Sequence, residues 1–390
     1  MQNYYAILKV STKAEERTIR AAYRRLARRL HPDVNQENDA HERMVLINKA
    51  YDVLSDPIKK AEYDLHFKIE PTSNRPTTKR PTKRATTRKS GAWAYLTLAA
   101  NLIGHEASVY SVAFNLKGTR LVSTSFDNCI RSWDIPSGAP REAHNAHAGS
   151  LSVVAFDDNT PIAAGSGEKT VQIYRVSDSG EVKSCKKRVE WASCLSFSPD
   201  GSLLAAGSSD ARVRIWRTED GRSVKTMTTH DDSVTALTFS ADNSLLASSD
   251  KRIWLTRISD GLPIKRIVGH RASITALALN KDNTLLASGS VDRMIKIWRV
   301  SDGELIHSTN GHSDWVESLA FSPDGWLLAS CSGDKTIKLW RVSDGEEIGT
   351  IIAHDSRVYS LKFSPNGRYL VSAGMDRAIK LWKIRTADTM

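Results

Sequence analysis

The chain has 390 residues, of which 40% are hydrophobic and 25% charged, and its formal net charge is +11. This length has room for two or three domains, and the composition is ordinary for globular domains with buried apolar cores. The longest apolar runs, such as 98–103, are too short to cross a bilayer, and the N-terminus MQNYYAILKV lacks the pattern of a secretory signal. We therefore expect a cytoplasmic protein.

The first 66 residues have the apolar spacing of amphipathic helices. Between 14 and 30, apolar side chains recur at helical intervals and arginines cover most of the remaining surface. Pro32 disfavours helical geometry at His31, so this helix ends there. A second apolar stripe covers 39–54, and a short third helix follows over 57–64. Since the two long stripes match in length, we expect an antiparallel helical hairpin with His31, Pro32 and Asp33 at its exposed tip.

Most of the excess positive charge lies in one segment, 67–92, which is rich in proline, threonine, lysine and arginine. Residues 68–92 hold 8 basic residues against 1 acidic residue, whereas 1–67 hold 12 against 10. A segment with so little apolar surface to bury is expected to be a flexible, disordered linker. Contact with an acidic surface, with nucleic acid or with a nuclear-import receptor is the alternative.

From residue 93 to 390 the chain repeats with a period of about 42 residues. Each repeat alternates apolar and polar residues in short runs that are divided by SPDG-like turns, which indicates about four strands per repeat. The aromatic marker of the repeat, or its replacement, stands at Trp133, Tyr174, Trp216, Thr256, Trp298, Trp340 and Trp382. This pattern predicts an all-β propeller with seven blades.

The ends of the repeat region predict how the propeller closes. The seventh repeat stops after Trp382, so its blade lacks an outermost strand. The segment AYLTLAANLIGH, which precedes the first repeat, is a spare strand that can supply it. Pairing the two would close the ring and remove exposed sheet edges.

The repeats resemble WD (WD40) repeats over about 95–390. Their marker histidines are His105, His147, His230, His270, His312 and His354, and the turn carboxylates are Asp127, Glu168, Asp210, Asp250, Asp292, Asp334 and Asp376. The resemblance implies that these residues and a Ser or Thr on the second strand form a hydrogen-bond network within each blade. Their even spacing puts one pair in each blade, which argues against a shared metal site.

Blades 2–4 depart from the WD pattern, so we expect them to be less regular. Blade 2 carries Glu168 and Tyr174, and blade 3 has Arg188 in the place of the histidine. Blade 4 has Thr256 in the place of the tryptophan and is two residues short.

The N-terminal region resembles the J-domain of DnaJ-type co-chaperones over residues 3–66. The matching stretches are NYYAILKVS, IRAAYRRLARRLHPDV and INKAYDVLSDPIKKAEYD. The resemblance implies that the domain binds a DnaK-type chaperone and stimulates its hydrolysis of ATP. His31, Pro32 and Asp33 would make the short-range contacts. Electrostatic attraction would come from four residues of the preceding helix, Arg20, Arg24, Arg25 and Arg28.

Other chemistries for the HPD tripeptide have less support. A histidine and an aspartate at a helical tip suggest acid–base catalysis or metal binding, but no pocket, nucleophile or third ligand is evident nearby. DNA or RNA binding by the arginine helix is conceivable, although the net charge of 1–67 is only +2. No GxxxxGK[ST] loop occurs, so the chain is expected to regulate an ATPase and not to be an enzyme itself.

No cofactor or metal is expected. The four cysteines form no CxxC pair, which argues against a disulfide framework and a structural zinc site and favours a reducing compartment; they are Cys129, Cys185, Cys194 and Cys331.

One face of the propeller is predicted to bind a partner protein. WD propellers commonly use the residues that flank the first strand of each blade and precede the turn carboxylate. Those positions give Ser108, Tyr110 and Phe126 in blade 1, Trp191 in blade 3, Trp315 and Glu317 in blade 6, and Arg357, Tyr359 and Met375 in blade 7. Trp, Tyr and Arg are enriched in binding hot spots. The alternative is that these side chains only pack on neighbouring blades.

The leading hypothesis is a co-chaperone that acts as an adaptor. Its J-domain would recruit the ATPase, and its propeller would select a client or a cellular site. The alternative is a scaffold protein with a vestigial or docking-only J-domain, associated with nucleic acid through the linker. An enzyme hidden in the propeller is a third hypothesis, which the lack of polar insertions in the repeats disfavours.

Overall fold

The computed structural model divides into two compact units, Met1–Arg88 and Lys89–Met390. It describes residues 4–8, 10, 50–51, 54 and 94–386, the last range with gaps at 146–149, 158–159, 168–169, 177–181 and 190. In the first unit it describes one helix, α1 (Tyr4–Leu8). The four buried side chains described there are Tyr5, Leu8, Ala50 and Leu54. The predicted helical hairpin, its HPD tip and the linker lie outside the described residues.

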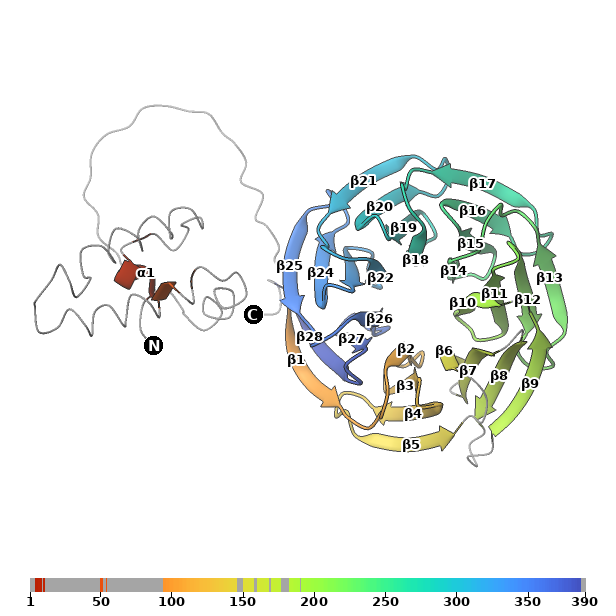
Figure 1. The fold of residues 1–390 in the computed structure, drawn as a ribbon, viewed down its shortest axis with the longest axis horizontal. Helices are drawn as coiled ribbons and strands as arrows, with labels where there is room; N and C mark the ends of the chain where they lie inside the picture. The colour runs from red at the N-terminus through yellow and green to blue at the C-terminus, as the bar shows by residue number, and fades with distance from the viewer. Residues whose placement is uncertain are drawn as a thin grey trace, which may run out of the picture. The chain divides into compact units, whose positions relative to one another are not determined.

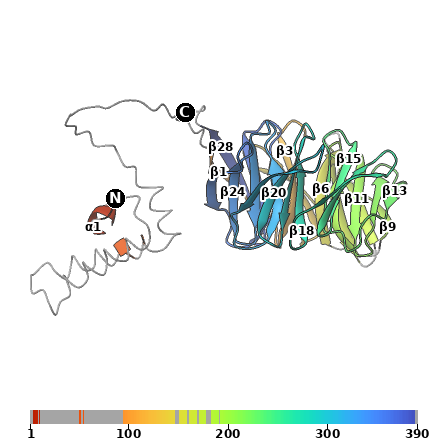
Figure 2. The same cartoon turned by 90° about the horizontal axis from the view of Figure 1, so that it is seen from above.

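The second unit is a ring of seven four-stranded antiparallel sheets, seen along its axis in Figure 1 and edge-on in Figure 2. The strands of the first three blades are β2 (Val109–Phe114), β3 (Arg120–Ser125), β4 (Cys129–Asp134), β5 (Pro140–Asn145), β6 (Ser150–Asp157), β7 (Thr160–Gly167), β8 (Thr170–Val176), β9 (Val182–Arg188), β10 (Ala192–Phe197), β11 (Leu203–Ser208), β12 (Val213–Arg217) and β13 (Ser223–Met227). Within each blade, consecutive strands pair from the centre of the ring outward.

The next three blades repeat the same order. Their strands are β14 (Ala236–Phe239), β15 (Leu245–Ser249), β16 (Arg252–Arg257), β17 (Pro263–Val268), β18 (Ile274–Leu279), β19 (Leu285–Ser290), β20 (Met294–Arg299), β21 (Leu305–Asn310), β22 (Val316–Phe321), β23 (Leu327–Ser332), β24 (Thr336–Arg341) and β25 (Glu347–Ile352). The predicted number of blades is confirmed.

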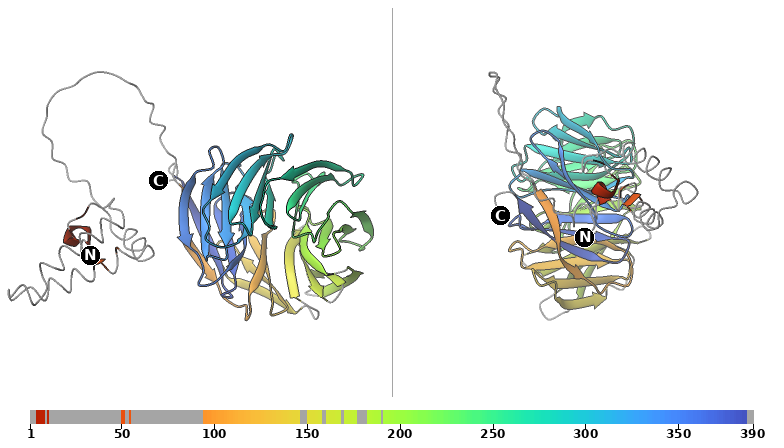
Figure 3. Two further views of the ribbon diagram at one scale, coloured as in Figure 1. Left: turned by 45° about the horizontal axis from the view of Figure 1, so that its top comes forward. Right: turned by 90° about the vertical axis from the view of Figure 1, so that its left-hand side faces the viewer.

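The seventh blade closes the ring as the sequence predicts. It contains β26 (Val358–Phe363), β27 (Tyr369–Gly374) and β28 (Ile379–Thr386), and its outermost strand is β1 (Ala94–Leu102), from the start of the unit. Strands β1 and β28 are antiparallel and lie side by side (Figure 3). Leu96 and Leu102 of β1 are buried in the core of the closed ring, so the closure adds apolar packing to the backbone pairing.

The apolar pattern of each blade explains its burial. The second strands are buried on both faces, and β23 is buried along its whole length, because neighbouring blades cover both sides of the sheet. The outermost strands alternate between exposed and partly buried residues, as in β25. The SPDG-like turns are held locally: Asp200 accepts hydrogen bonds from Ser198 and Ser202, and Gly201 has a φ of 75°, which glycine adopts without strain.

Four blades contain the complete hydrogen-bond network that the WD resemblance implies. In blade 1, Nδ1 of His105 lies 2.8 Å from Oδ2 of Asp127, and Nε2 lies 2.8 Å from Oγ of Ser123. The indole N–H of Trp133 donates to the same serine oxygen at 2.9 Å. Blades 5, 6 and 7 repeat this arrangement around His270, His312 and His354. His147 and Glu168 of blade 2 lie outside the described residues.

Blade 3 replaces the missing histidine with an arginine from another strand. Arg214 of β12 donates to Asp210 at 2.6 Å and to Oγ of Ser208 at 3.4 Å. Burial acts to raise the pKa of Asp210, but the hydrogen bonds from Arg214 and Ser208 outweigh it and lower the pKa to about 2. The carboxylate of this blade therefore has a hydrogen-bond partner within the blade, although Arg188 stands in the sequence position of the histidine.

Blade 4 replaces its missing tryptophan with one from two positions earlier on the same strand. The rings of Trp254 and His230 have centroids 6.5 Å apart, against 6.4 Å for His270 and Trp298 in blade 5. Residues 254 and 256 share one face of β16, since strand side chains alternate. The indole N–H of Trp254 and the hydroxyl of the buried Thr256 have no hydrogen-bond partner in the described part of the chain, so this network is incomplete. The expected irregularity of blades 3 and 4 is confirmed.

Candidate interaction face

The seven predicted partner-binding residues of the propeller lie on three neighbouring blades, 6, 7 and 1. They are Tyr110, Phe126, Trp315, Glu317, Arg357, Tyr359 and Met375, and we call this set the interaction face. The ring brings blades 7 and 1 together because β1 closes it. Side-chain contacts join six of the seven residues into two groups, one between blades 6 and 7 and one between blades 7 and 1.

Arg357 holds the blade 6 part of the face together. Its guanidinium lies 5.1 Å from the ring centre of Trp315, a cation–π distance. The same group pairs with Glu317 at 3.2 Å and with Asp314 at 3.3 Å. Because two carboxylates and one ring fix the guanidinium, the side chain of Trp315 has a preformed support on one of its sides. The other side of the ring is available, since the residue is 43% exposed.

Three aromatic rings form the blade 7 and blade 1 part of the face. Tyr110 and Tyr359 are stacked, with ring centroids 4.7 Å apart and planes at 18°. Phe126 lies against Tyr110 with centroids 5.2 Å apart, in a tilted arrangement. Both tyrosines are half-buried, whereas Phe126 is 54% exposed. Rigid aromatic side chains of this kind provide contact area at a low entropic cost.

Met375 lies in the turn before Asp376 and is half-exposed. Its backbone carbonyl accepts a long hydrogen bond of 3.5 Å from the hydroxyl of Ser108 in blade 1. Its amide donates to the carbonyl of Arg357 at 2.8 Å. Methionine is flexible and polarisable, so at this place it can adapt to the surface of a partner.

Burial changes the acid–base properties of two groups in the face. Burial raises the pKa of the Glu317 carboxyl, and the nearby Asp314 adds to the effect, while Arg357 acts against it. Burial also raises the pKa of the Tyr110 hydroxyl, to which the neighbouring Tyr359 contributes. Arg357 carries one positive charge and contacts two carboxylates. This part of the face therefore has a net negative charge when Asp314 and Glu317 are both ionised.

One predicted residue, Trp191, does not lie with the interaction face, and one residue that was not predicted, Asp314, does. Trp191 precedes β10 in blade 3, is 58% exposed and has a φ of 35°, but blade 3 is not adjacent to blades 6, 7 or 1. Asp314 was not predicted, although it directly precedes Trp315 in the sequence. Its carboxylate accepts a hydrogen bond from the Trp315 amide at 2.8 Å, so it orients the backbone that carries the indole.

The packing alternative accounts for part of the set. Glu317, Tyr110 and Tyr359 are half-buried and pack on one another or on neighbouring blades. Phe126, Trp315 and Met375, in contrast, are each more than 40% exposed, so a partner can reach them. Grouped exposed apolar side chains with a polar surround are typical of protein-interaction sites.

The chaperone-binding residues predicted in the first unit lie outside the described residues, so they stay predictions; they are Arg20, Arg24, Arg25, Arg28, His31, Pro32 and Asp33. Among the residues that the structure describes, no three His, Cys, Asp or Glu side chains gather to hold a metal ion. No helix in the described ranges is both long and apolar enough to cross a membrane.

Models of known protein families match both the N-terminal region and the repeat region of the chain. The DnaJ domain model matches residues 3–64. The model of the WD domain, G-beta repeat, matches residues 96–134, 261–299, 303–341 and 345–383. These matches end in blades 1, 5, 6 and 7, the four whose hydrogen-bond network is complete. The model of the anaphase-promoting complex subunit 4 WD40 domain matches residues 161–242, in blades 2–4.

Two relatives each match the chain over a short length. Over 63 residues the chain is 56% identical to the chaperone protein DnaJ of Cyanothece sp., which covers 16% of this chain and 17% of the relative. Over the same length it is 52% identical to the curved DNA-binding protein of Pseudomonas putida, covering 16% of this chain and 20% of the relative. The chain thus spans a fifth or less of the relatives it matches. It carries a DnaJ domain followed by WD40 repeats that form a seven-bladed propeller.

Proposed function

We propose that this protein is a cytoplasmic co-chaperone whose J-domain binds a DnaK-type chaperone and stimulates its ATPase, while the propeller selects a client or a cellular site. The observation that carries the proposal is the joining, in one chain, of a DnaJ domain to a propeller with grouped exposed aromatic residues on one face. The chain itself would act without a cofactor and not as an enzyme, because the chemistry belongs to the chaperone.

The J-domain half of the proposal rests on electrostatic guidance followed by short-range contact. Arg20, Arg24, Arg25 and Arg28 would attract an acidic surface of the chaperone, raise the encounter rate and fix the orientation. His31 and Asp33 would then make the contacts that favour the hydrolysing state of the partner. Pro32 restricts the loop that carries them, so less conformational entropy is lost on docking.

The propeller half of the proposal rests on preorganisation. Arg357 already contacts Trp315, Glu317 and Asp314 before any partner arrives. The stacked pair of Tyr110 and Tyr359 is likewise formed in advance. A partner that binds this face therefore orders few additional side chains, which lowers the entropic cost of association.

The chaperone half is tested by single-turnover ATP hydrolysis. A purified DnaK-type chaperone loaded with ATP is mixed with the full chain, with a His31→Gln variant and with a His307→Gln variant. We expect the wild type and His307→Gln to accelerate hydrolysis equally and His31→Gln to have no effect. His307 is the matched control because it undergoes the same substitution on β21 of the propeller. No acceleration by the wild type would refute the proposal.

A scaffold associated with nucleic acid is the second candidate, and the basic segment 68–92 supports it. In that case the full chain should bind DNA or RNA with an affinity that falls steeply with salt, because phosphate contacts release counterions. Deletion of 75–89 should abolish this binding. Salt-insensitive binding or none would rule out the second candidate.

A further inference from the structure

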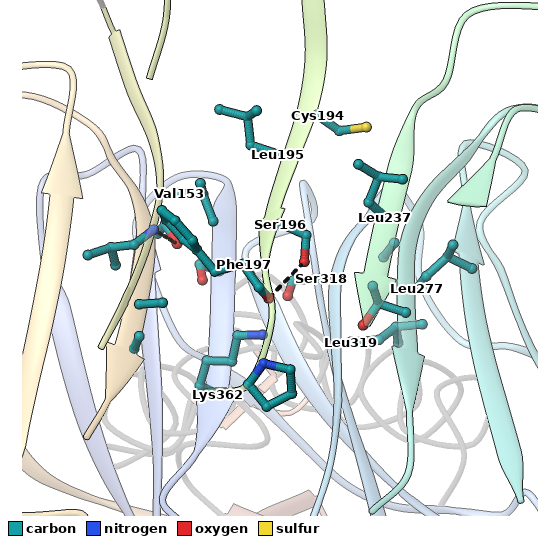
Figure 4. A pocket seen from close by; sticks show the side chains of 18 of the residues that line it. Val153, Cys194, Leu195, Ser196, Phe197, Leu237, Leu277, Ser318, Leu319 and Lys362 are labelled. Carbon is teal, nitrogen blue, oxygen red and sulfur yellow. Dashed lines mark hydrogen bonds between the residues drawn. The ribbon is translucent and has the colours of Figure 1, made fainter. Parts of the chain in front are cut away.

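The inner strands of the seven blades enclose a central channel of about 400 Å³. Its lining residues come from every blade, and most of them are small or apolar. Glu317 and Lys362 are the two charged residues among the lining residues that the structure describes. Figure 4 shows Lys362 extending into this space, which Ser196 and Ser318 also line. Glu317 is paired with Arg357, whereas Lys362 has no ion pair within the described part of the chain.

Lys362 departs from the pattern of its own position in the repeat. It lies on β26 opposite Val371 of β27. The corresponding residues of the other inner strands, identified by the same pairing with the second strand, are Ala113, Ala155, Ser196, Thr238, Ala278 and Ala320. Six blades thus place a small side chain here, and one blade places a lysine. The long side chain therefore reaches into the space that the small residues leave open.

The ammonium group of Lys362 has no hydrogen bond or ion pair within the described part of the chain. Lys362 is exposed to the channel, whose walls come from all seven blades. This enclosure lowers the pKa of its amine, because removal from bulk water disfavours the charged form. An anion in the channel would meet this ammonium group with no competing ion pair from the described residues, and it would favour the charged form of the amine.

Hydroxyl groups that line the channel can complete an anion site. The hydroxyls of Thr238, Ser318 and Ser360 line the channel and form no hydrogen bond within the described residues. Thr235, in contrast, donates to the carbonyl of Ile274 at 2.6 Å and is occupied by the contact between blades. Free hydroxyls donate to oxyanions, and an ammonium group serves as a point charge for phosphate or carboxylate.

We propose that the central channel of the propeller binds an oxyanion, a phosphoryl or a carboxylate group, through the ammonium group of Lys362 and hydroxyls of the surrounding inner strands. The volume is ample for such a group and for a small molecule that carries it. The site shares Glu317 with the interaction face, and it gives the propeller a means to sense a small anionic ligand.

The proposal is tested by calorimetric titration of the full chain with inorganic phosphate and, separately, with acetate. The variants are Lys362→Met, which keeps the length of the side chain, and Lys251→Met, an exposed lysine in the turn before β16 as the matched control. We expect the wild type and Lys251→Met to bind one or both anions and Lys362→Met to bind at least tenfold more weakly. Binding of phosphate alone identifies a phosphoryl ligand, and binding of acetate alone identifies a carboxylate.

Thermal unfolding, followed by tryptophan fluorescence, separates loss of binding from loss of fold. The anion that binds should raise the melting temperature of the wild type and leave that of Lys362→Met unchanged, although this variant melts no lower than the wild type without anion. Equal affinity of the wild type and Lys362→Met, or no binding of either anion by the wild type, would overturn the proposal.

Discussion

Blade 6 contains two tryptophans with opposite surroundings. Trp340 is 3% exposed, and its indole N–H donates to Oγ of Ser330 at 2.8 Å, next to His312. Trp315 is 43% exposed, and its described ring contact is the guanidinium of Arg357. Trp340 therefore belongs to the core and Trp315 to the interaction face. The residue type alone does not distinguish them, because tryptophan is enriched in binding hot spots wherever it lies on an interface.

These surroundings predict different effects on stability. Trp340→Ala should lower the free energy of unfolding by about 3–5 kcal/mol, because it leaves a cavity and removes the hydrogen bond from the indole to Ser330. Trp315→Ala should cost about 1 kcal/mol or less, since it removes a partly exposed ring and one cation–π contact. Chemical denaturation followed by tryptophan fluorescence measures both, because all ten tryptophans lie in 93–390. Equal losses would show that Trp315 belongs to the core and would argue against its role in the interaction face.

The buried histidines predict that acid destabilises the propeller. Burial lowers the pKa of His105, His230 and His270 below the usual 6.5, although the paired carboxylates act against it. As the pH falls below 6.5, the unfolded chain binds protons that the folded chain does not, so stability decreases. The denaturation midpoint should therefore be lower at pH 5.5 than at pH 7.5.

A His270→Gln variant serves as the control for this effect. It should be less stable than the wild type at pH 7.5, because it loses the hydrogen bonds to Asp292 and Ser288. Its midpoint should also change less between the two pH values, since one titrating group is gone. A midpoint of the wild type that does not change between pH 7.5 and 5.5 would contradict the account.

At the scale of the blade, the sequence predicts that blades 3 and 4 are irregular, but it does not predict which side chains replace the missing histidine and tryptophan. The absence of Trp from position 256 marks blade 4 as unusual. Whether Trp254 would turn toward His230 depends on the side-chain conformation and on the neighbouring Arg266, which lies 5.6 Å from its ring centre. The same holds for Arg214 in blade 3, since a charged residue on a third strand usually faces solvent.

The tryptophan of blade 4 can be moved from position 254 to position 256, where the other blades carry their aromatic residue. Trp254→Lys should destabilise the propeller, because it empties the space beside His230. Adding Thr256→Trp should recover part of the loss, since blade 5 has the same pair, Lys296 and Trp298, with the indole N–H bonded to Oγ of Ser288. Denaturation midpoints of the two variants measure the recovery. A double variant that is less stable than Trp254→Lys alone would contradict this interpretation.

At the scale of the whole molecule, the period of the sequence determines much of what could be predicted. A period of about 42 residues predicts seven blades, and the missing last strand predicts that β1 pairs with β28, both of which are confirmed. That the residues of the interaction face lie on neighbouring blades was also predictable, because equivalent positions of neighbouring repeats lie on one face of a propeller. Binding of a partner there stays a prediction.

Other features depend on side-chain contacts that the period does not determine. Asp314 pairs with Arg357 only because both side chains turn toward each other. Lys362 is unusual only in comparison with the equivalent position of each blade, which requires the strand pairing. The role of His31 and its neighbours follows from the resemblance to J-domains and stays a prediction.

The central claim is that two separate binding activities reside in one chain, and affinity capture from cell extract tests it most directly. The full chain serves as bait in three forms: wild type, His31→Gln, and Trp315→Ala combined with Tyr359→Ala. We predict that His31→Gln loses the DnaK-type chaperone but retains the partner of the propeller, and that the double variant loses that partner but retains the chaperone. Loss of both proteins from a single variant, or of neither from any, would contradict the account.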